Sequence, residues 1–163
     1  MKNMKWLWLS CFVIVLDQVT KAIIRHTMTE GQSLNVWDKI IMLTYAQNTG
    51  AAFSLSLGNP AINRIFFIVI PIIAVGFVLY LLNLSTSKWQ NVGLSLVVGG
   101  AIGNLIDRIM LGSVTDFVDC DFPDFIMQRW PIFNVADSSI VIAMFILAFY
   151  ILFLERKKNL PQA

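Results

Sequence analysis

Residues 65–84 read IFFIVIPIIAVGFVLYLLNL, a stretch with no charged side chain and with Pro71 as its one interruption. About 20 residues, each rising 1.5 Å along a helix, cross the roughly 30 Å hydrocarbon core of a bilayer. Backbone amide and carbonyl groups in lipid must be hydrogen-bonded within the segment itself, so this stretch is predicted to be a helix. We therefore expect a membrane protein.

Three further apolar segments of similar length accompany this one, at about residues 6–24, 92–111 and 138–154. The chain of 163 residues is 57% hydrophobic and only 13% charged, and its mean hydropathy is +0.71. An average soluble domain carries about twice that share of charge. The fold class is thus predicted to be an all-α membrane protein with four transmembrane helices, forming a single domain over residues 1–163. The first segment could instead be a cleaved signal peptide, but its apolar run continues to Leu16, and we expect it to be retained.

Basic residues near the segment ends predict the orientation. One side carries Lys2, Lys5, Lys88 and residues 156–158, and it is predicted to be cytoplasmic, with both termini inside. Connections 25–62 and 112–137 then face outward together, although basic residues on that side make the bias moderate. Within the first of them, the apolar residues between Leu34 and Tyr45 predict short strands at the membrane interface. The net charge of +2 gives no indication of a nucleic-acid partner.

Ionisable residues at membrane depth are costly and are often functional. Asp17 and Lys21 are four residues apart on one helix face, so a structural ion pair is as reasonable as a catalytic role, and we interpret the pair as structural. Asn104, Asp107 and Arg108 share one arc of the third helix, where buried packing polarity is the alternative to a functional role. The spacing of Gly99 and Gly103 predicts the close approach of another helix.

Asp116 follows the third apolar segment, and Asp137 begins the fourth. Taken alone, Asp137 could be a helix N-cap, and Asp116 could be one acidic loop residue among several. Both, however, belong to the outer side, as do other polar residues: Asn48, Asn104, Arg108 and Asn134. Two close carboxylates share a proton, so that one activates water while the other polarises a carbonyl, as in aspartic peptide hydrolysis. Because a helix N-terminus favours a negative charge, we expect the shared proton to lie more on Asp116.

Five ordered blocks resemble the lipoprotein signal peptidases, the type II signal peptidases of bacteria. The blocks are DQVTK at 17–21, NTGAAF at 48–53, GNLIDR at 103–108, VTDF at 114–117 and FNVADS at 133–138. The resemblance runs over nearly the whole chain. It departs at Thr115, where the family more often has an aliphatic residue, and in the acidic and aromatic stretch 119–130, which leaves the shape of an outer lid open.

The resemblance implies four membrane helices with a small outer-surface β-sheet, or cradle, and a short outer helix. It implies an endopeptidase that removes the signal peptide from diacylglyceryl-modified prolipoproteins before the lipidated cysteine, without a metal or an organic cofactor. The expected partners are this substrate and membrane lipid, with the chain acting as a monomer in the bacterial cytoplasmic (inner) membrane and its active site near the outer face.

The same resemblance assigns roles to residues. Asp116 and Asp137 would form the catalytic pair. Residues expected to hold the substrate or to orient the pair are Asn48, Gly50, Asn104, Arg108 and Asn134. Residues expected to be structural are Asp17, Lys21 and Asp107.

Two functions from other classes remain open on the residues alone. In a proton-coupled transporter, Asp17, Asp107 and Arg108 would form a relay and the outer acids would be incidental. A non-catalytic scaffold protein is the other, although it explains no grouping of the polar residues. Cleavage of a lipidated precursor, or proton uptake that depends on Asp17 or Asp107, would separate the three.

Overall fold

The computed structural model describes residues 3–38, 40–50, 59–121 and 130–155. A single turn of 3-10 helix, η1 (Met4–Trp6), leads into α1 (Leu7–Thr27), and a helical hairpin follows later in the chain. The helices of the hairpin are α2 (Pro60–Leu84) and α3 (Lys88–Leu111), and the last helix is α4 (Val135–Phe149), which continues as the π-helix η3 (Tyr150–Glu155). All four apolar segments are thus helical, and by length and composition each could cross a membrane.

The helices extend beyond their predicted apolar runs. α2 begins at Pro60 and not at residue 65, and α3 begins at Lys88 and not at residue 92. The added turns are polar, and polar turns are tolerated where a helix leaves the hydrocarbon for the interface. Proline at the first helical position adds no unsatisfied donor. At the other end of α3, Gly112 caps the helix in the left-handed conformation, with φ of 80°, which glycine adopts without strain.

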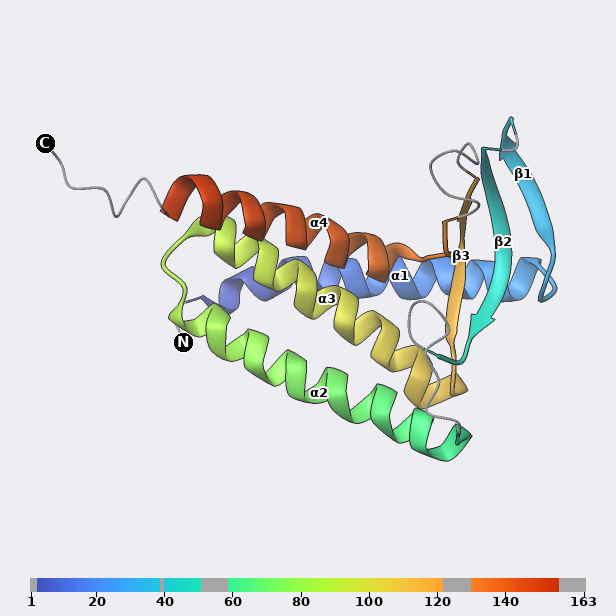
Figure 1. Ribbon diagram of the computed structural model, residues 1–163, viewed down its shortest axis with the longest axis horizontal. Helices are drawn as coiled ribbons and strands as arrows, with labels where there is room; N and C mark the ends of the chain where they lie inside the picture. The colour runs from blue at the N-terminus through green and yellow to red at the C-terminus, as the bar shows by residue number, and fades with distance from the viewer. Residues whose placement is uncertain (1–2, 39, 51–58, 122–129, 156–163) are drawn as a thin grey trace, which may run out of the picture.

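α3 is the central helix of the bundle, with α1, α2 and α4 packed around it (Figure 1). Its glycines allow the close approach. A Cβ atom on Gly99 would lie 2.8 Å from Val13 Cβ of α1, and one on Gly103 would lie 2.7 Å from Asp17 Oδ2. The predicted role of these two glycines in helix packing is confirmed.

An antiparallel sheet of three strands in the order β1-β2-β3 lies at one end of the bundle, where α1 ends and α4 begins (Figure 1). β1 spans Ser33–Trp37 and β2 spans Ile41–Asn48, so the predicted strands in this segment are confirmed. β3 (Val114–Cys120) is the strand nearest the helices. In the register, Asn48 pairs with Val114 and Ala46 pairs with Asp116, which brings the end of β2 beside Asp116.

Asp116 lies in β3 and not in a loop, the alternative that the sequence alone left open. Val114–Cys120 is a strand because it pairs with a strand about 70 positions earlier in the chain. Apart from the ends of α1, α2 and α4, the described parts of the two outer connections contain no helix. The resemblance also implies a short outer helix, and segments 51–58 and 122–129 of these connections lie outside the described residues.

Polarity in the bundle is arranged opposite to that of a soluble protein. Large apolar side chains of α2 are exposed, including Ile65 and Ile73 at 63% and 62% of their surface, whereas Asp17 and Lys21 are completely buried. Exposed hydrocarbon around a polar interior is stable only where the surrounding solvent is itself apolar. The candidate site lies in this polar interior, at the end of the bundle that carries the sheet.

Candidate active site

Asp137 is held by the first turn of α4. Asn134 is the N-cap residue, and its side-chain oxygen accepts a hydrogen bond from the Asp137 backbone N at 3.0 Å. In return, Asp137 Oδ2 accepts from the Asn134 backbone N at 3.1 Å, completing a capping box. The alternative that Asp137 is itself the N-cap is therefore wrong, because Asn134 occupies that position. Capping uses only one carboxylate oxygen, and Asp137 Oδ1 accepts from Asn104 Nδ2 at 2.7 Å.

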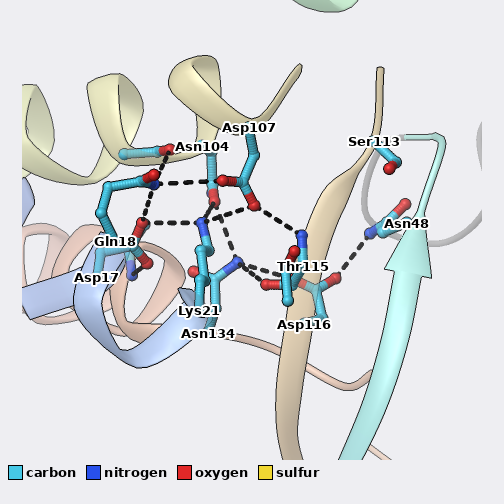
Figure 2. Close-up of polar contacts among 12 residues, drawn as sticks. Asp17, Gln18, Lys21, Asn48, Asn104, Asp107, Ser113, Thr115, Asp116 and Asn134 are labelled. Carbon is cyan, nitrogen blue, oxygen red and sulfur yellow. Dashed lines mark hydrogen bonds and ion pairs between the residues drawn. The ribbon is translucent and has the colours of Figure 1, made fainter. Parts of the chain in front are cut away.

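Asp116 is buried, with 3% of its surface exposed. Its Oδ1 accepts a hydrogen bond from Asn134 Nδ2 at 2.6 Å, and its Oδ2 accepts from Asn48 Nδ2 at 3.1 Å (Figure 2). Asn134 therefore contacts both acids: its side-chain amide binds Asp116, and its backbone and side-chain oxygen bind Asp137. The predicted convergence of Asp116, Asp137, Asn48, Asn104 and Asn134 is present.

Behind these residues lies the ion pair of α1. Lys21 Nζ is 2.8 Å from Asp17 Oδ2 and 3.7 Å from Asp107 Oδ2, and it donates a hydrogen bond to Asn104 Oδ1 at 2.8 Å. Asp17 Oδ1 accepts from the backbone N of Ala136, in the first turn of α4, at 2.9 Å. The predicted Asp17–Lys21 pair is present, and it joins α1 to both α3 and the start of α4 (Figure 2).

Asp107 links α3 to β3. Its Oδ2 accepts a hydrogen bond from the Thr115 backbone N at 2.9 Å, and its Oδ1 lies 3.4 Å from Arg25 Nη1. Arg25 also donates to Thr115 Oγ1 at 3.1 Å, so both residues fix the strand position just before Asp116. Gln18 donates to the carbonyl of Gly103 at 3.1 Å. 

Gln18, Arg25 and Thr115 were not assigned as site residues from the sequence. A signal was available for Arg25, because Asp17, Lys21 and Arg25 repeat every four residues and so share one face of α1. Gln18 and Thr115 lie inside the motif blocks but have no spacing of their own that indicates a role.

Within the part of the chain that the structure describes, no hydrogen bond joins Arg108 or Gly50 to either acid. The Arg108 guanidinium stacks over the Phe67 ring at 5.6 Å from its centroid, and its charge interacts with those of Asp137 and Asp116. The Gly50 backbone N donates to Asn48 Oδ1 at 3.0 Å, which turns the Asn48 amide so that its NH₂ group faces Asp116. Their predicted contacts with substrate stay predictions.

Burial and charge make Asp116 a weak acid. Its pKa is raised from 3.8 to about 6, mainly because the carboxyl group is removed from water and also because the negative charge of Asp137 lies nearby. The hydrogen bonds from Asn48 and Asn134 oppose this shift, as does the charge of Lys21. Near neutral pH, one member of the pair can therefore carry a proton. Within the described residues, no three His, Cys, Asp or Glu side chains are grouped so that they could hold a metal ion.

Comparison with known proteins agrees with this arrangement. The family model described as Signal peptidase (SPase) II matches residues 9–153. The lipoprotein signal peptidase of Psychromonas ingrahamii is 37% identical over 162 residues, covering 98% of this chain and 91% of that protein. The lipoprotein signal peptidase of Coxiella burnetii is 38% identical over 159 residues, covering 96% of this chain and 95% of that protein.

A solved structure gives the same result for the fold. It is described as a bacterial membrane enzyme, superposes with a TM-score of 0.82 at 33% identity, and covers 98% of this chain and 93% of its own. The fold, the family model and the relatives agree over nearly the full length of the chain, which therefore belongs to the signal peptidase II family and is a multi-pass bacterial membrane peptidase.

Proposed function

We propose that this chain is an aspartic endopeptidase that removes the signal peptide from diacylglyceryl-modified prolipoproteins, cleaving immediately before the lipidated cysteine. The observation that carries the proposal is the pairing of Asp116 and Asp137 through Asn134, at the sheet end of four apolar helices. Membership of the signal peptidase II family supports the class of substrate. 

In the proposed reaction, Asp137 is the ionised base and Asp116 is the protonated acid. Asp137 takes a proton from a water molecule, whose oxygen adds to the scissile carbonyl carbon, while Asp116 gives its proton to the carbonyl oxygen. In the second step the C–N bond breaks as Asp137 passes its proton to the departing cysteine nitrogen. Asp116 takes back the proton that it gave to the former carbonyl oxygen, as the C=O bond of the new peptide carboxyl group forms, so the pair returns to its starting state.

The remaining residues have supporting roles in this proposal. Asn48 and Asn134 hold the Asp116 carboxyl group, Asn104 and Asn134 hold that of Asp137, and Gly50 orients Asn48. Arg108 is proposed to hold the substrate. Asp17, Lys21 and Asp107 support the architecture, and no metal or organic cofactor takes part.

The proposed orientation places the sheet and the acids at the outer face of the bacterial inner membrane. Lys5 and Lys88 lie at the opposite end of the bundle from the sheet, where the positive-inside rule expects cytoplasmic lysines. The other basic residues used in the prediction, Lys2 and residues 156–158, lie outside the described residues. Both termini would then be cytoplasmic. The enzyme would act as a monomer, and its lipid-anchored substrate would reach the site from within the bilayer.

The substrate proposal is tested with purified enzyme in liposomes. A precursor peptide whose cysteine carries a diacylglyceryl thioether is expected to be cut before that cysteine, which mass spectrometry of the product would identify. The matched control is the same peptide with an unmodified cysteine, and we expect no detectable cleavage of it. Equal cleavage of both peptides would contradict the proposed substrate class, and proton uptake without any cleavage would favour the transporter instead.

The pH dependence of turnover follows from the raised pKa of Asp116. Below a pH of about 6 this carboxyl group keeps its proton, and above it the general acid is lost. We therefore expect kcat to fall as the pH rises through this region. The midpoint of this fall reports the titration of Asp116 and Asp137 as a coupled pair. The measurement is kcat for the lipidated peptide over the pH range in which the enzyme stays folded. A rate that increases steadily with pH up to about pH 8 would contradict the assignment of the acid.

A further inference from the structure

Lys21 is linked to the two acids through Asn104 and not by direct contact. Its side chain is fully buried, and its ammonium group contacts Asp17 Oδ2, Asn104 Oδ1 and Asp107 Oδ2. An ammonium group has three donors and no acceptor. The atom of Asn104 that faces Lys21 must therefore be the amide oxygen.

The orientation of the Asn104 amide has a direct consequence for Asp137. With its oxygen toward Lys21, Asn104 presents its NH₂ group to Asp137 Oδ1 at 2.7 Å. The same oxygen accepts from Asn134 Nδ2 at 3.0 Å. Rotating the amide by half a turn would place its NH₂ group against two donors and its oxygen against a carboxylate, which makes all three contacts repulsive.

From this chain of contacts we propose that Lys21 is a positioning residue for the general base: it fixes the Asn104 amide so that a donor always faces Asp137. Asp137 then receives one N–H on each oxygen, from Asn104 and from the Asn134 backbone. Hydrogen bonds to a carboxylate favour its ionised form. The proposal rests on the proposed function, because it assigns Lys21 a role in keeping the base of that reaction ready to accept a proton.

The charges of Arg108 in α3 and Asp116 in β3 also act on Asp137, and they are kept in the test. Lys21 has its own charged neighbours: Asp17 of α1 and Asp107 of α3, which also pairs with Arg25. Removing Lys21 alone would leave Asp17 without its counter-ion. The double variant Asp17→Asn/Lys21→Met instead removes one charge of each sign, and the Asn side-chain oxygen can still accept from the Ala136 backbone N.

The experiment measures kcat and KM for the lipidated peptide against pH. The acid limb of the kcat profile is the fall of kcat at low pH, where the general base becomes protonated. In Asp17→Asn/Lys21→Met we expect this limb to move to higher pH by about one unit, the effect of losing one well-placed hydrogen bond to a charge. KM is expected to change much less than kcat. Lys88→Met, the same substitution at an exposed lysine of the opposite end, is the matched control and should keep the parental profile.

A second variant tests whether Lys21 acts through Asn104. Asn104→Leu should produce the same shift of the acid limb, and combining it with Asp17→Asn/Lys21→Met should add nothing further. An unchanged acid limb in either variant, when thermal unfolding shows that it is folded, would overturn the proposal and leave Lys21 a purely structural residue. Failure of the proposed function would look different, because Asp116→Asn and Asp137→Asn would then still cleave.

Discussion

Asp116→Asn and Asp137→Asn are each expected to lower kcat for the lipidated precursor by at least about 10³-fold, because one role of a two-residue acid–base mechanism is lost. In Asp116→Asn the site has no proton to give to the carbonyl oxygen. In Asp137→Asn it has no base to activate water. The measurement is single-turnover cleavage of the precursor peptide by enzyme in liposomes, followed by mass spectrometry.

Asp38→Asn is the matched control for this pair. The same substitution is made at an exposed aspartate that follows β1. Its backbone has φ of 42°, a conformation that Asn tolerates well. This variant should cleave at the parental rate. The aspartic mechanism would be contradicted if Asp116→Asn and Asp137→Asn both cleaved at a near-parental rate while unfolding at the parental temperature.

The second large effect is expected at Gly100, where α3 packs directly against the first turns of α4. A Cβ atom at this position would contact the carbonyl oxygen of Ala136, would lie 2.5 Å from Ser139 Oγ and would lie 2.7 Å from Ile140 Cγ1. Backbone cannot move away as a flexible side chain can, so Gly100→Ala should force α4 outward at a cost of about 1–3 kcal/mol. Because the displaced turn carries Asp137, we expect both the thermal unfolding midpoint and the cleavage rate to fall.

Gly76→Ala provides the comparison. A Cβ atom on Gly76, in the middle of α2, would meet no atom within 4 Å, and alanine favours the helix by about 1 kcal/mol relative to glycine. The two variants introduce the same methyl group into two membrane helices. Equal unfolding midpoints for Gly100→Ala and Gly76→Ala would show that the contact between α3 and α4 is not tight.

Much of the site could be predicted because its residues repeat with helical spacing or begin a helix. Asp17 and Lys21 are four apart, so their pairing follows from the geometry of one helix. Asp116 and Asp137 flank one outer connection, so their convergence follows from the order of the spans. The four helices themselves were predictable, since only a helix can satisfy its own backbone in lipid.

What could not be predicted depends on contacts between distant segments. β3 is a strand only because β2 lies beside it, and the alternation of Val114–Cys120 is too short to indicate this alone. The identity of the helix cap was also ambiguous, because Asn134 and Asp137 are both good N-cap residues and the choice depends on where the turn begins. The orientation of each side-chain amide depends on a donor from another helix, as for Asn104 and Lys21.

The ion pair within α1 also bears on how the protein enters the membrane. Asp17 and Lys21 belong to a single helix, so they can neutralise each other before any other helix is present. A lone charged residue at the centre of a helix costs about 2.5–3.5 kcal/mol on insertion. The first helix therefore carries a counter-ion for each of these two charges within itself, before Asn104 and Asp107 of α3 add their contacts to Lys21.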